Sequence, residues 1–119
     1  MKIQNFLGLI QRTGLFLIVV CLLFFSSVSN AWAADLENGE KVFQVNCVGC
    51  HVNGGNIIRR GKNLKLKTLQ KNGYADVEAI AFLVSNGKAN MSAYKDRLTP
   101  EQIEDVAAYV LAQAEKGWK

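Results

Sequence analysis

Four stretches of the chain place apolar residues at the spacing of an α-helix. The clearest one follows Thr99 and Pro100, which are typical of an N-cap and a first helical position, and Gln102 completes a capping box. Its apolar stripe consists of Ile103, Val106, Ala107, Val110, Leu111 and Ala114. This pattern predicts a long amphipathic helix that ends before Gly117.

Two shorter helices are expected before it. Asp76 is expected to cap a helix that ends at Gly87, and residues 67–72 are expected to form a short helix ended by Gly73. The first of these has apolar residues at i, i+3, i+4 and i+7, namely Val77, Ile80, Ala81 and Val84. Three leucines around the short helix are expected to be buried: Leu64, Leu66 and Leu69.

The remaining helix is expected to begin after Asp35, its N-cap, and to run to about Asn46. Its inward-facing residues are predicted to be Leu36, Val42 and Phe43. Because Gly39 has no side chain, the last helix can cross it closely, with small Ala107 and Ala108 at the contact. No part of the sequence alternates apolar and polar residues as a strand would. The expected fold is therefore all-α, with about four helices.

The first thirty residues follow a different pattern. Lys2 and Arg12 are their only charges, an apolar run covers residues 15–25, and Ala31-Trp32-Ala33 supplies a small-x-small sequence. This order is typical of a Sec-type signal peptide. A membrane anchor is the alternative, but an apolar run of about eleven to fifteen residues falls short of the roughly twenty that a spanning helix needs. We expect residues 1–33 to be cleaved and residues 34–119 to form one domain.

The charge and size of the chain change once the leader is removed. The 119-residue chain has a formal charge of +4, and the 86 residues left after cleavage keep 12 basic and 10 acidic side chains, a charge of about +2. Cys21 leaves with the leader, so two cysteines remain. A domain of this size buries little surface on its own. A large apolar cofactor at its centre would therefore stabilise it.

The motif Cys47-Val48-Gly49-Cys50-His51 has the spacing that attaches a c-type haem. Two thiols on one turn can form thioethers with the two vinyl groups of a porphyrin, and the next residue can present its imidazole to the iron. Half of a zinc site and a thiol–disulfide motif are the alternatives. Zinc needs about four ligands, whereas the chain after the leader offers these two cysteines and one histidine.

The numbers of histidines and methionines in the chain indicate a candidate for the second iron ligand. The chain has one histidine and two methionines, and Met1 belongs to the leader, which leaves Met91 in a polar loop with Gly87, Lys88 and Asn90. Met91 is either a core-filling residue or the second axial ligand of a His/Met cytochrome c, a pairing that raises the reduction potential. With both iron faces occupied, the expected chemistry is one-electron transfer without catalysis. A five-coordinate haem sensor or enzyme is the alternative.

Residues 52–75 contain no acidic side chain and six basic ones: Arg59, Arg60, Lys62, Lys65, Lys67 and Lys71. A solvated face and a docking surface for an acidic partner are both open interpretations. Nucleic-acid binding is disfavoured, because the protein is expected to be exported and no aromatic residues interleave the charges. A small apolar docking patch is expected at Val48, Val52 and Ile57.

Residues 34–119 resemble class I cytochromes c, and most closely cytochrome c6. The resemblance rests on Ala34-Asp35-Leu36, the haem motif, Asn86-Gly87-Lys88 with Met91, Arg97-Leu98, and an ending that includes Glu115-Lys116-Gly117-Trp118. It implies one covalent haem c on Cys47 and Cys50, axial ligation by His51 and Met91, and a monomeric class I cytochrome c fold.

The resemblance also implies a role. Cytochromes c6 are soluble carriers of the thylakoid lumen that take electrons from cytochrome f of the cytochrome b6f complex to photosystem I, and some serve a terminal oxidase. Arg97 matches an arginine that the family is thought to use at photosystem I. Location in the lumen, or in the periplasm, is therefore expected.

Two positions depart from the family pattern. The family commonly has Met-Pro-Ala-Phe at the axial methionine, where this chain has Met91-Ser92-Ala93-Tyr94. Leu83 stands where the family commonly has a glutamine facing the haem. Because polar groups near a haem help to set its potential, Leu83 is expected to lower it. A divergent, lower-potential member that serves another redox partner is therefore the alternative function.

Overall fold

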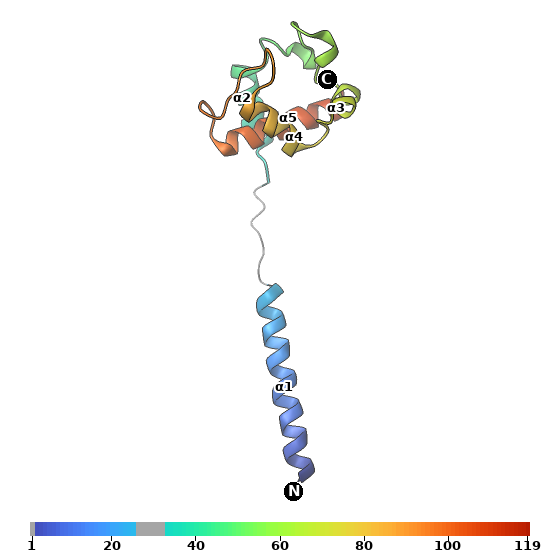
Figure 1. Cartoon of the computed structure of the whole chain (residues 1–119), viewed down its shortest axis with the longest axis vertical. Helices are drawn as coiled ribbons and strands as arrows, with labels where there is room; N and C mark the ends of the chain where they lie inside the picture. The colour runs from blue at the N-terminus through green and yellow to red at the C-terminus, as the bar shows by residue number, and fades with distance from the viewer. Residues whose placement is uncertain (1, 26–32) are drawn as a thin grey trace. The chain divides into compact units, whose positions relative to one another are not determined.

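The computed structural model describes residues 2–25 and 33–119 (Figure 1). The chain forms two units, Met1–Trp32 and Ala33–Lys119. In the first unit, α1 spans Lys2–Phe25. In the described part of the chain, we find no helix with both the length and the hydropathy of a membrane span. The predicted cleavage sequence Ala31-Trp32-Ala33 lies, apart from Ala33, outside the described residues.

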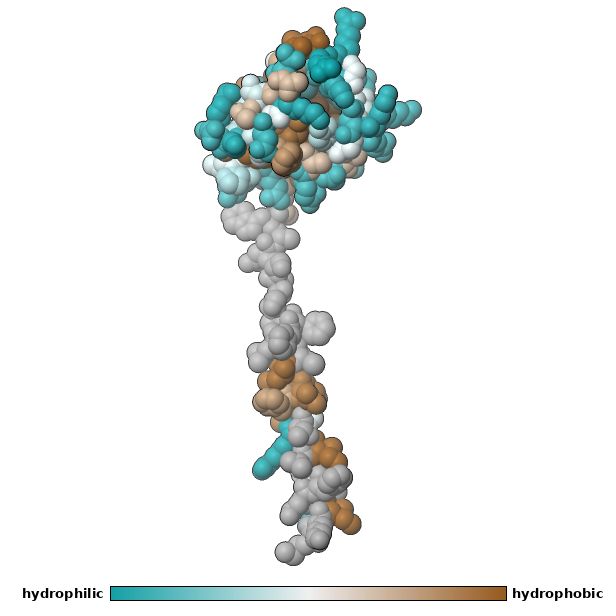
Figure 2. Space-filling view, viewed as in Figure 1, coloured by the Kyte–Doolittle hydropathy of each residue, from teal (hydrophilic) through white to brown (hydrophobic). Residues whose placement is uncertain are grey.

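The described side chains of α1 are largely apolar and face solvent (Figure 2). Leu15, Phe16 and Leu17 are each more than 60% exposed. A helix that leaves large apolar side chains in water gains no stability from burial. In contrast, the second unit presents a mainly hydrophilic face in this view, with smaller apolar areas between the polar side chains (Figure 2).

The second unit contains four α-helices and two short 3₁₀ turns, as the all-α prediction requires. These elements are α2 (Leu36–Asn46), η1 (Val52–Gly54), η2 (Arg60–Lys62), α3 (Leu66–Asn72), α4 (Val77–Asn86) and α5 (Pro100–Lys116). Helix α5 is the central element, because α2, α4, α3 and η1 all pack against it (Figure 1). In the described residues, β-type pairing is limited to one isolated bridge between Lys88 and Met91.

The helix boundaries agree with the predicted capping residues. The Asp35 carboxylate accepts hydrogen bonds from the N–H groups of Glu37 and Asn38, and Asp76 accepts one from Ala79 N–H. At the start of α5, both hydrogen bonds of the predicted capping box are present. Three helices end at the predicted glycines, Gly73, Gly87 and Gly117.

Helices α2 and α5 cross at Gly39, as expected, but the partner residues differ from the prediction. A Cβ atom at Gly39 would lie 2.2 Å from the Asp105 carbonyl oxygen and 2.9 Å from Tyr109 Cβ, so only glycine fits this contact. The partner residues are thus Asp105 and Tyr109, in place of Ala107 and Ala108. Leu36, which was expected to face inward, is 44% exposed because it lies in the first turn of α2, before the crossing.

Two buried features of α5 and the C-terminus were not predicted. The Asp105 carboxylate is buried and accepts hydrogen bonds from Asp35 N–H at 2.8 Å and from the Asn38 amide at 2.7 Å. The Trp118 indole packs 5.2 Å from the Phe43 ring, and its N–H donates to the Leu64 carbonyl at 3.0 Å. Both features close the domain around the α2–α5 crossing.

The three leucines around α3 are buried to different extents. Leu69 is buried in the core, whereas Leu64 and Leu66 are half-buried against it. The apolar face of α4 behaves similarly, since Ile80 and Val84 are buried and Val77 and Ala81 are half-buried. Of these residues, Leu64, Leu69, Ile80 and Val84 line a cavity between α2, α3, α4 and α5.

Candidate functional site

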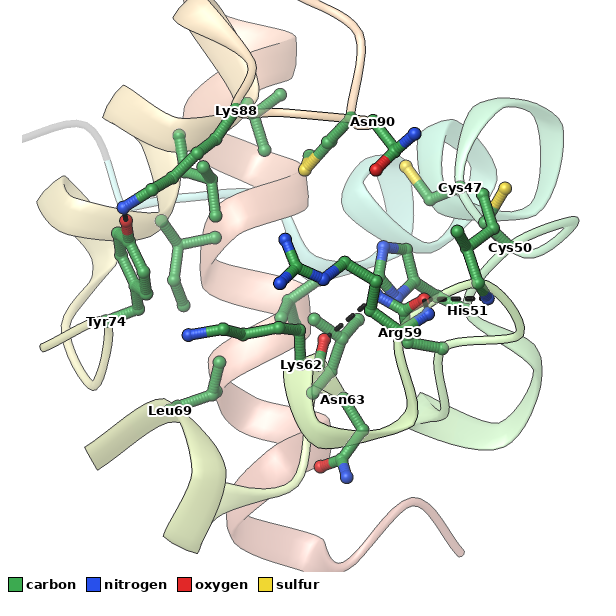
Figure 3. Close-up of a pocket in the computed structure, with 18 of the residues that line it drawn as sticks. Cys47, Cys50, His51, Arg59, Lys62, Asn63, Leu69, Tyr74, Lys88 and Asn90 are labelled. Carbon is green, nitrogen blue, oxygen red and sulfur yellow. Dashed lines mark hydrogen bonds between the residues drawn. The ribbon is translucent and has the colours of Figure 1, made fainter. Parts of the chain in front are cut away.

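The Cys-x-x-Cys-His motif continues the last turn of α2. Cys47 is the C-cap of this helix, and its N–H donates to the Phe43 carbonyl at 2.8 Å. The N–H groups of Cys50 and His51 then donate to the Cys47 carbonyl at 3.2 and 3.0 Å. This compact turn brings both thiols and the imidazole to the wall of one cavity (Figure 3). The sequence-based expectation that one turn presents all three groups together agrees with this geometry.

His51 is oriented by a hydrogen bond that the sequence did not reveal. Its Nδ1 atom lies 2.8 Å from the Gly55 carbonyl oxygen. Because a carbonyl oxygen can only accept, Nδ1 is the donor here, and in the neutral imidazole the lone pair is on Nε2. A metal-binding histidine is commonly oriented in this way by a backbone carbonyl. In the close-up, the imidazole extends into the cavity (Figure 3).

Met91 reaches the same cavity from a loop forty positions further along the chain. Gly87 turns the chain with φ +67°, and Lys88 and Met91 then exchange two backbone hydrogen bonds of 3.0 Å each. A Cβ atom at Gly87 would lie 2.5 Å from the Met91 carbonyl oxygen. Glycine at this position therefore lets the loop fold tightly and present the half-buried Met91 side chain.

The cavity is lined mainly by apolar side chains from α2, α3, α4 and α5. These are Phe43, Leu69, Ile80, Leu83, Val84, Val106 and Val110. Leu83 is half-buried and belongs to the wall that α4 provides. Such a lining excludes water and suits a large, flat, apolar cofactor.

Cationic side chains complete the cavity wall. Among the described residues that line it are Arg59, Lys62 and Lys88, and none of those lining residues is Asp or Glu. In Figure 3, the Arg59 and Lys62 side chains extend toward the centre of the cavity. A haem has two carboxylates, and this charge pattern is complementary to them. The chemistry of the donor set and the walls thus fits a haem.

The environment of Cys47 differs from that of a redox-active thiol. Burial raises the pKa of the Cys47 thiol to about 11, and the neighbouring Cys50 adds to the rise. Reactive thiols usually have lowered pKa values, often at the N-terminus of a helix, whereas Cys47 lies at the C-terminal end of α2. The geometry therefore favours cofactor attachment over thiol–disulfide exchange.

The predicted docking residues are accessible to different degrees. Arg97 is exposed, with its guanidinium 4.8 Å above the Tyr94 ring. Val52 and Ile57 are 51% and 66% exposed, but Val48 is half-buried against the core and offers less surface than expected. Ile58, which was not predicted, lines the cavity and is also 57% exposed.

The six basic residues of the segment 52–75 are all exposed to solvent. Two of them, Arg59 and Lys62, also line the cavity. The segment therefore combines a solvated basic surface with part of the site wall. The sequence pattern revealed the charge but not the contribution of these two residues to the cavity.

Comparison with known proteins identifies the class first. A family model described as "Cytochrome C oxidase, cbb3-type, subunit III" matches residues 34–110. This range contains the haem motif and the Met91 loop. Together with the all-α fold and the donor set, the match defines a c-type cytochrome.

The relatives identify the family within this class. A "Cytochrome c6-like" protein of Nostoc sp. (strain PCC 7120) is 57% identical over 98% of this chain and 99% of its own. "Cytochrome c6" of the same strain is 50% identical over 89% of this chain and 96% of its own. The crystal structure of cytochrome c6C from Synechococcus sp. PCC 7002 matches with a TM-score of 0.65 and 57% identity, covering 66% of this chain and 96% of that one.

The chain therefore belongs to the cytochrome c6 family. Its cofactor is one covalently bound haem c, and it is an electron-transfer protein, not an enzyme.

Proposed function

We propose that the protein carries single electrons between cytochrome b6f and photosystem I as a soluble, monomeric photosynthetic protein of the thylakoid lumen. The haem supplies a reversible one-electron change between ferric and ferrous iron. In this proposal Cys47 and Cys50 would hold it through thioethers, and His51 and Met91 would be the two protein ligands of the iron. The observation that carries the proposal is the meeting of these four side chains, from two distant segments, at one apolar cavity.

The way in which His51 and Met91 are held explains why the site would transfer electrons without catalysing a reaction. His51 is held by Gly55 with its Nε2 lone pair free to bind, and Met91 is presented by a tightly turned loop. Ligands on both sides leave no position for a substrate. Partner docking would use the exposed Val52 and Ile57 side chains and the Arg97 guanidinium, which suits a weak and fast encounter.

Carbon monoxide binding to the ferrous, haem-loaded protein tests this ligation. The expected result is no binding by the wild-type protein and ready binding by Met91→Ala, which opens one side of the iron. An equally unreactive Met91→Ala variant would rule out Met91 as the ligand. Carbon monoxide binding by the wild-type protein would instead support a five-coordinate sensor or enzyme.

The location is part of the same proposal. Residues 1–33 are proposed to act as a Sec-type signal peptide that is removed after Ala33. The mass of the protein recovered after export tests this step. A mature chain that begins at Ala34 is expected, whereas retention of α1 would indicate a membrane-anchored form.

A second candidate is a lower-potential cytochrome that serves a terminal oxidase or another redox partner. Two observations favour it. The chain is 57% identical to the "Cytochrome c6-like" protein of Nostoc sp. (strain PCC 7120) but 50% identical to "Cytochrome c6" of the same strain. In addition, Leu83 places an apolar side chain in the cavity wall, where an amide would supply a polar group to tune the potential.

The midpoint potentials of the wild-type protein and its Leu83→Gln variant distinguish the two candidates. A potential high enough to accept electrons readily from cytochrome f, and little changed by Leu83→Gln, would support the photosystem I route. A clearly lower potential that Leu83→Gln raises would support the second candidate. Leu83→Ile is the matched control, because it keeps the side chain apolar and similar in volume.

A further inference from the structure

Tyr94, three residues after Met91, contacts the ends of two different helices. Its hydroxyl donates a hydrogen bond to the Asn46 carbonyl at the end of α2, at 3.0 Å. Its backbone N–H donates to the Val84 carbonyl near the end of α4, also at 3.0 Å. One residue thus connects the segment that follows Met91 to both helices.

The accepting carbonyls explain why these bonds form. The last four carbonyls of an α-helix have no N–H partner within the helix. At the end of α2, the Phe43 carbonyl is used by the N–H groups of Cys47 and Val48, and the Asn46 carbonyl is used by the Tyr94 hydroxyl. The peptide group that accepts this bond joins Asn46 to Cys47. The hydroxyl therefore holds the backbone at the first residue of the haem motif.

The Met91 loop is fixed on both sides by these contacts. Before Met91, the paired backbone hydrogen bonds with Lys88 close the turn that starts at Gly87. After Met91, Tyr94 and then Lys95, whose N–H donates to the Ser85 carbonyl at 3.2 Å, fasten the chain to α4. Of these anchors, only the Tyr94 hydroxyl reaches across to α2.

The Tyr94 ring is also held in place from the solvent side. The Arg97 guanidinium lies 4.8 Å above it, and the N–H groups of Arg97 and Leu98 both donate to the Tyr94 carbonyl at 2.9 Å. The ring itself is half-buried against the core. A ring fixed in this way loses little further freedom when its hydroxyl forms a hydrogen bond.

We infer that Tyr94 is a positioning residue: its hydroxyl ties the Met91 loop to the end of α2 and so keeps the Met91 sulfur facing the cavity. This inference rests on the proposed ligation by Met91 and adds the residue that stabilises it. Tyr94→Phe keeps the ring and the backbone contacts but removes the hydrogen bond across to α2. The loop then opens more often, and Met91 leaves its position more easily.

Imidazole binding to the ferric, haem-loaded protein measures this opening, because imidazole must displace Met91 from the iron. Losing one net hydrogen bond predicts about fivefold tighter apparent imidazole binding by Tyr94→Phe. Tyr94→Leu, which also removes the ring under Arg97, should bind imidazole more tightly still. The matched control is Tyr109→Phe, which removes a hydroxyl from a buried ring between α2 and α5 and should leave imidazole affinity unchanged.

Unchanged imidazole affinity in both Tyr94 variants would overturn the inference. Tighter binding in Tyr109→Phe as well would also overturn it, since the effect would then reflect general loosening of the domain. Met91→Ala separates the inference from the proposed function. If Met91→Ala binds imidazole far more tightly than wild type while the Tyr94 variants do not, only the inference fails. If Met91→Ala also matches wild type, Met91 is not the ligand and both fail.

Discussion

Replacing Asp105 by alanine should destabilise the domain without altering its haem site. The buried carboxylate is the acceptor for Asp35 N–H and for the Asn38 amide, at 2.8 and 2.7 Å. A buried donor left without a partner costs about 1–3 kcal/mol. Water can reach part of both donors, because these hydrogen bonds are only partly buried. We therefore expect Asp105→Ala to lower the free energy of unfolding by about 2–4 kcal/mol.

Chemical denaturation of the haem-loaded residues 34–119 measures this loss through Trp118 fluorescence. This tryptophan is the only one left after residue 33. The denaturant concentration at the midpoint of unfolding should fall. The m-value should stay unchanged, because the surface exposed on unfolding is the same. Glu104→Ala removes an exposed carboxylate from the same turn of α5 and is the matched control. A loss for Asp105→Ala no larger than that for Glu104→Ala would show that these two hydrogen bonds do not stabilise the domain. A changed midpoint potential would show that Asp105 also affects the haem site.

The remaining predictions concern the substitution of two glycines by alanine. Gly87→Ala would place Cβ 2.5 Å from the Met91 carbonyl oxygen at φ +67°, so the ferrous protein should bind carbon monoxide; an unreactive variant would contradict this account of the loop. Gly54→Ala would place Cβ 2.4 Å from the Trp118 indole at φ +70°, so the free energy of unfolding should fall by about 2 kcal/mol or more. Gly73→Ala controls for both, because its φ is +73° but the space beside it is open. Gly73→Ala should lower the free energy of unfolding by about 1 kcal/mol and should bind no carbon monoxide. An equal loss in Gly54→Ala would exclude a clash with the indole.

The sequence predicted those parts of the fold that depend on neighbouring residues. The capping box at Thr99 and Gln102 joins residues three positions apart, so its pattern is visible in the sequence and the structure confirms it. The same holds for Asp35 and Asp76 as N-caps. The haem motif is also local, because one turn at the end of α2 places its three side chains together.

Contacts between distant residues could not be predicted in this way. The burial of the Asp105 carboxylate was not predicted, because nothing in the local sequence indicates donors that lie 67 and 70 positions earlier. The hydrogen bond from Tyr94 to Asn46 spans 48 positions, and that from Trp118 to Leu64 spans 54. Such pairs are determined by the α2–α5 crossing, and their partners become apparent only once the helices are packed.

The candidate site contains both features that the sequence predicted and contacts that it did not. Met91 was expected to face His51 because counting left one methionine for the second ligand, and the structure places both residues at one cavity. The contribution of Arg59 and Lys62 to the cavity wall was not expected, because a run of basic residues usually faces water. The orientation of His51 by Gly55 depends on the backbone of η1, where Asn53 adopts φ +49°, a conformation that the sequence does not specify.

Ligation of the haem iron by Met91, opposite His51 in the proposed site, can be detected by NMR of the ferrous protein labelled with ¹³C at the methionine methyl group. After removal of the leader, Met91 is the only methionine of the chain, so one methyl resonance is expected. If Met91 binds the iron, the haem ring current should shift this resonance strongly upfield, because ligation would hold the methyl group close to the porphyrin. A single methyl resonance at the position of an ordinary methionine would show that Met91 does not bind the iron.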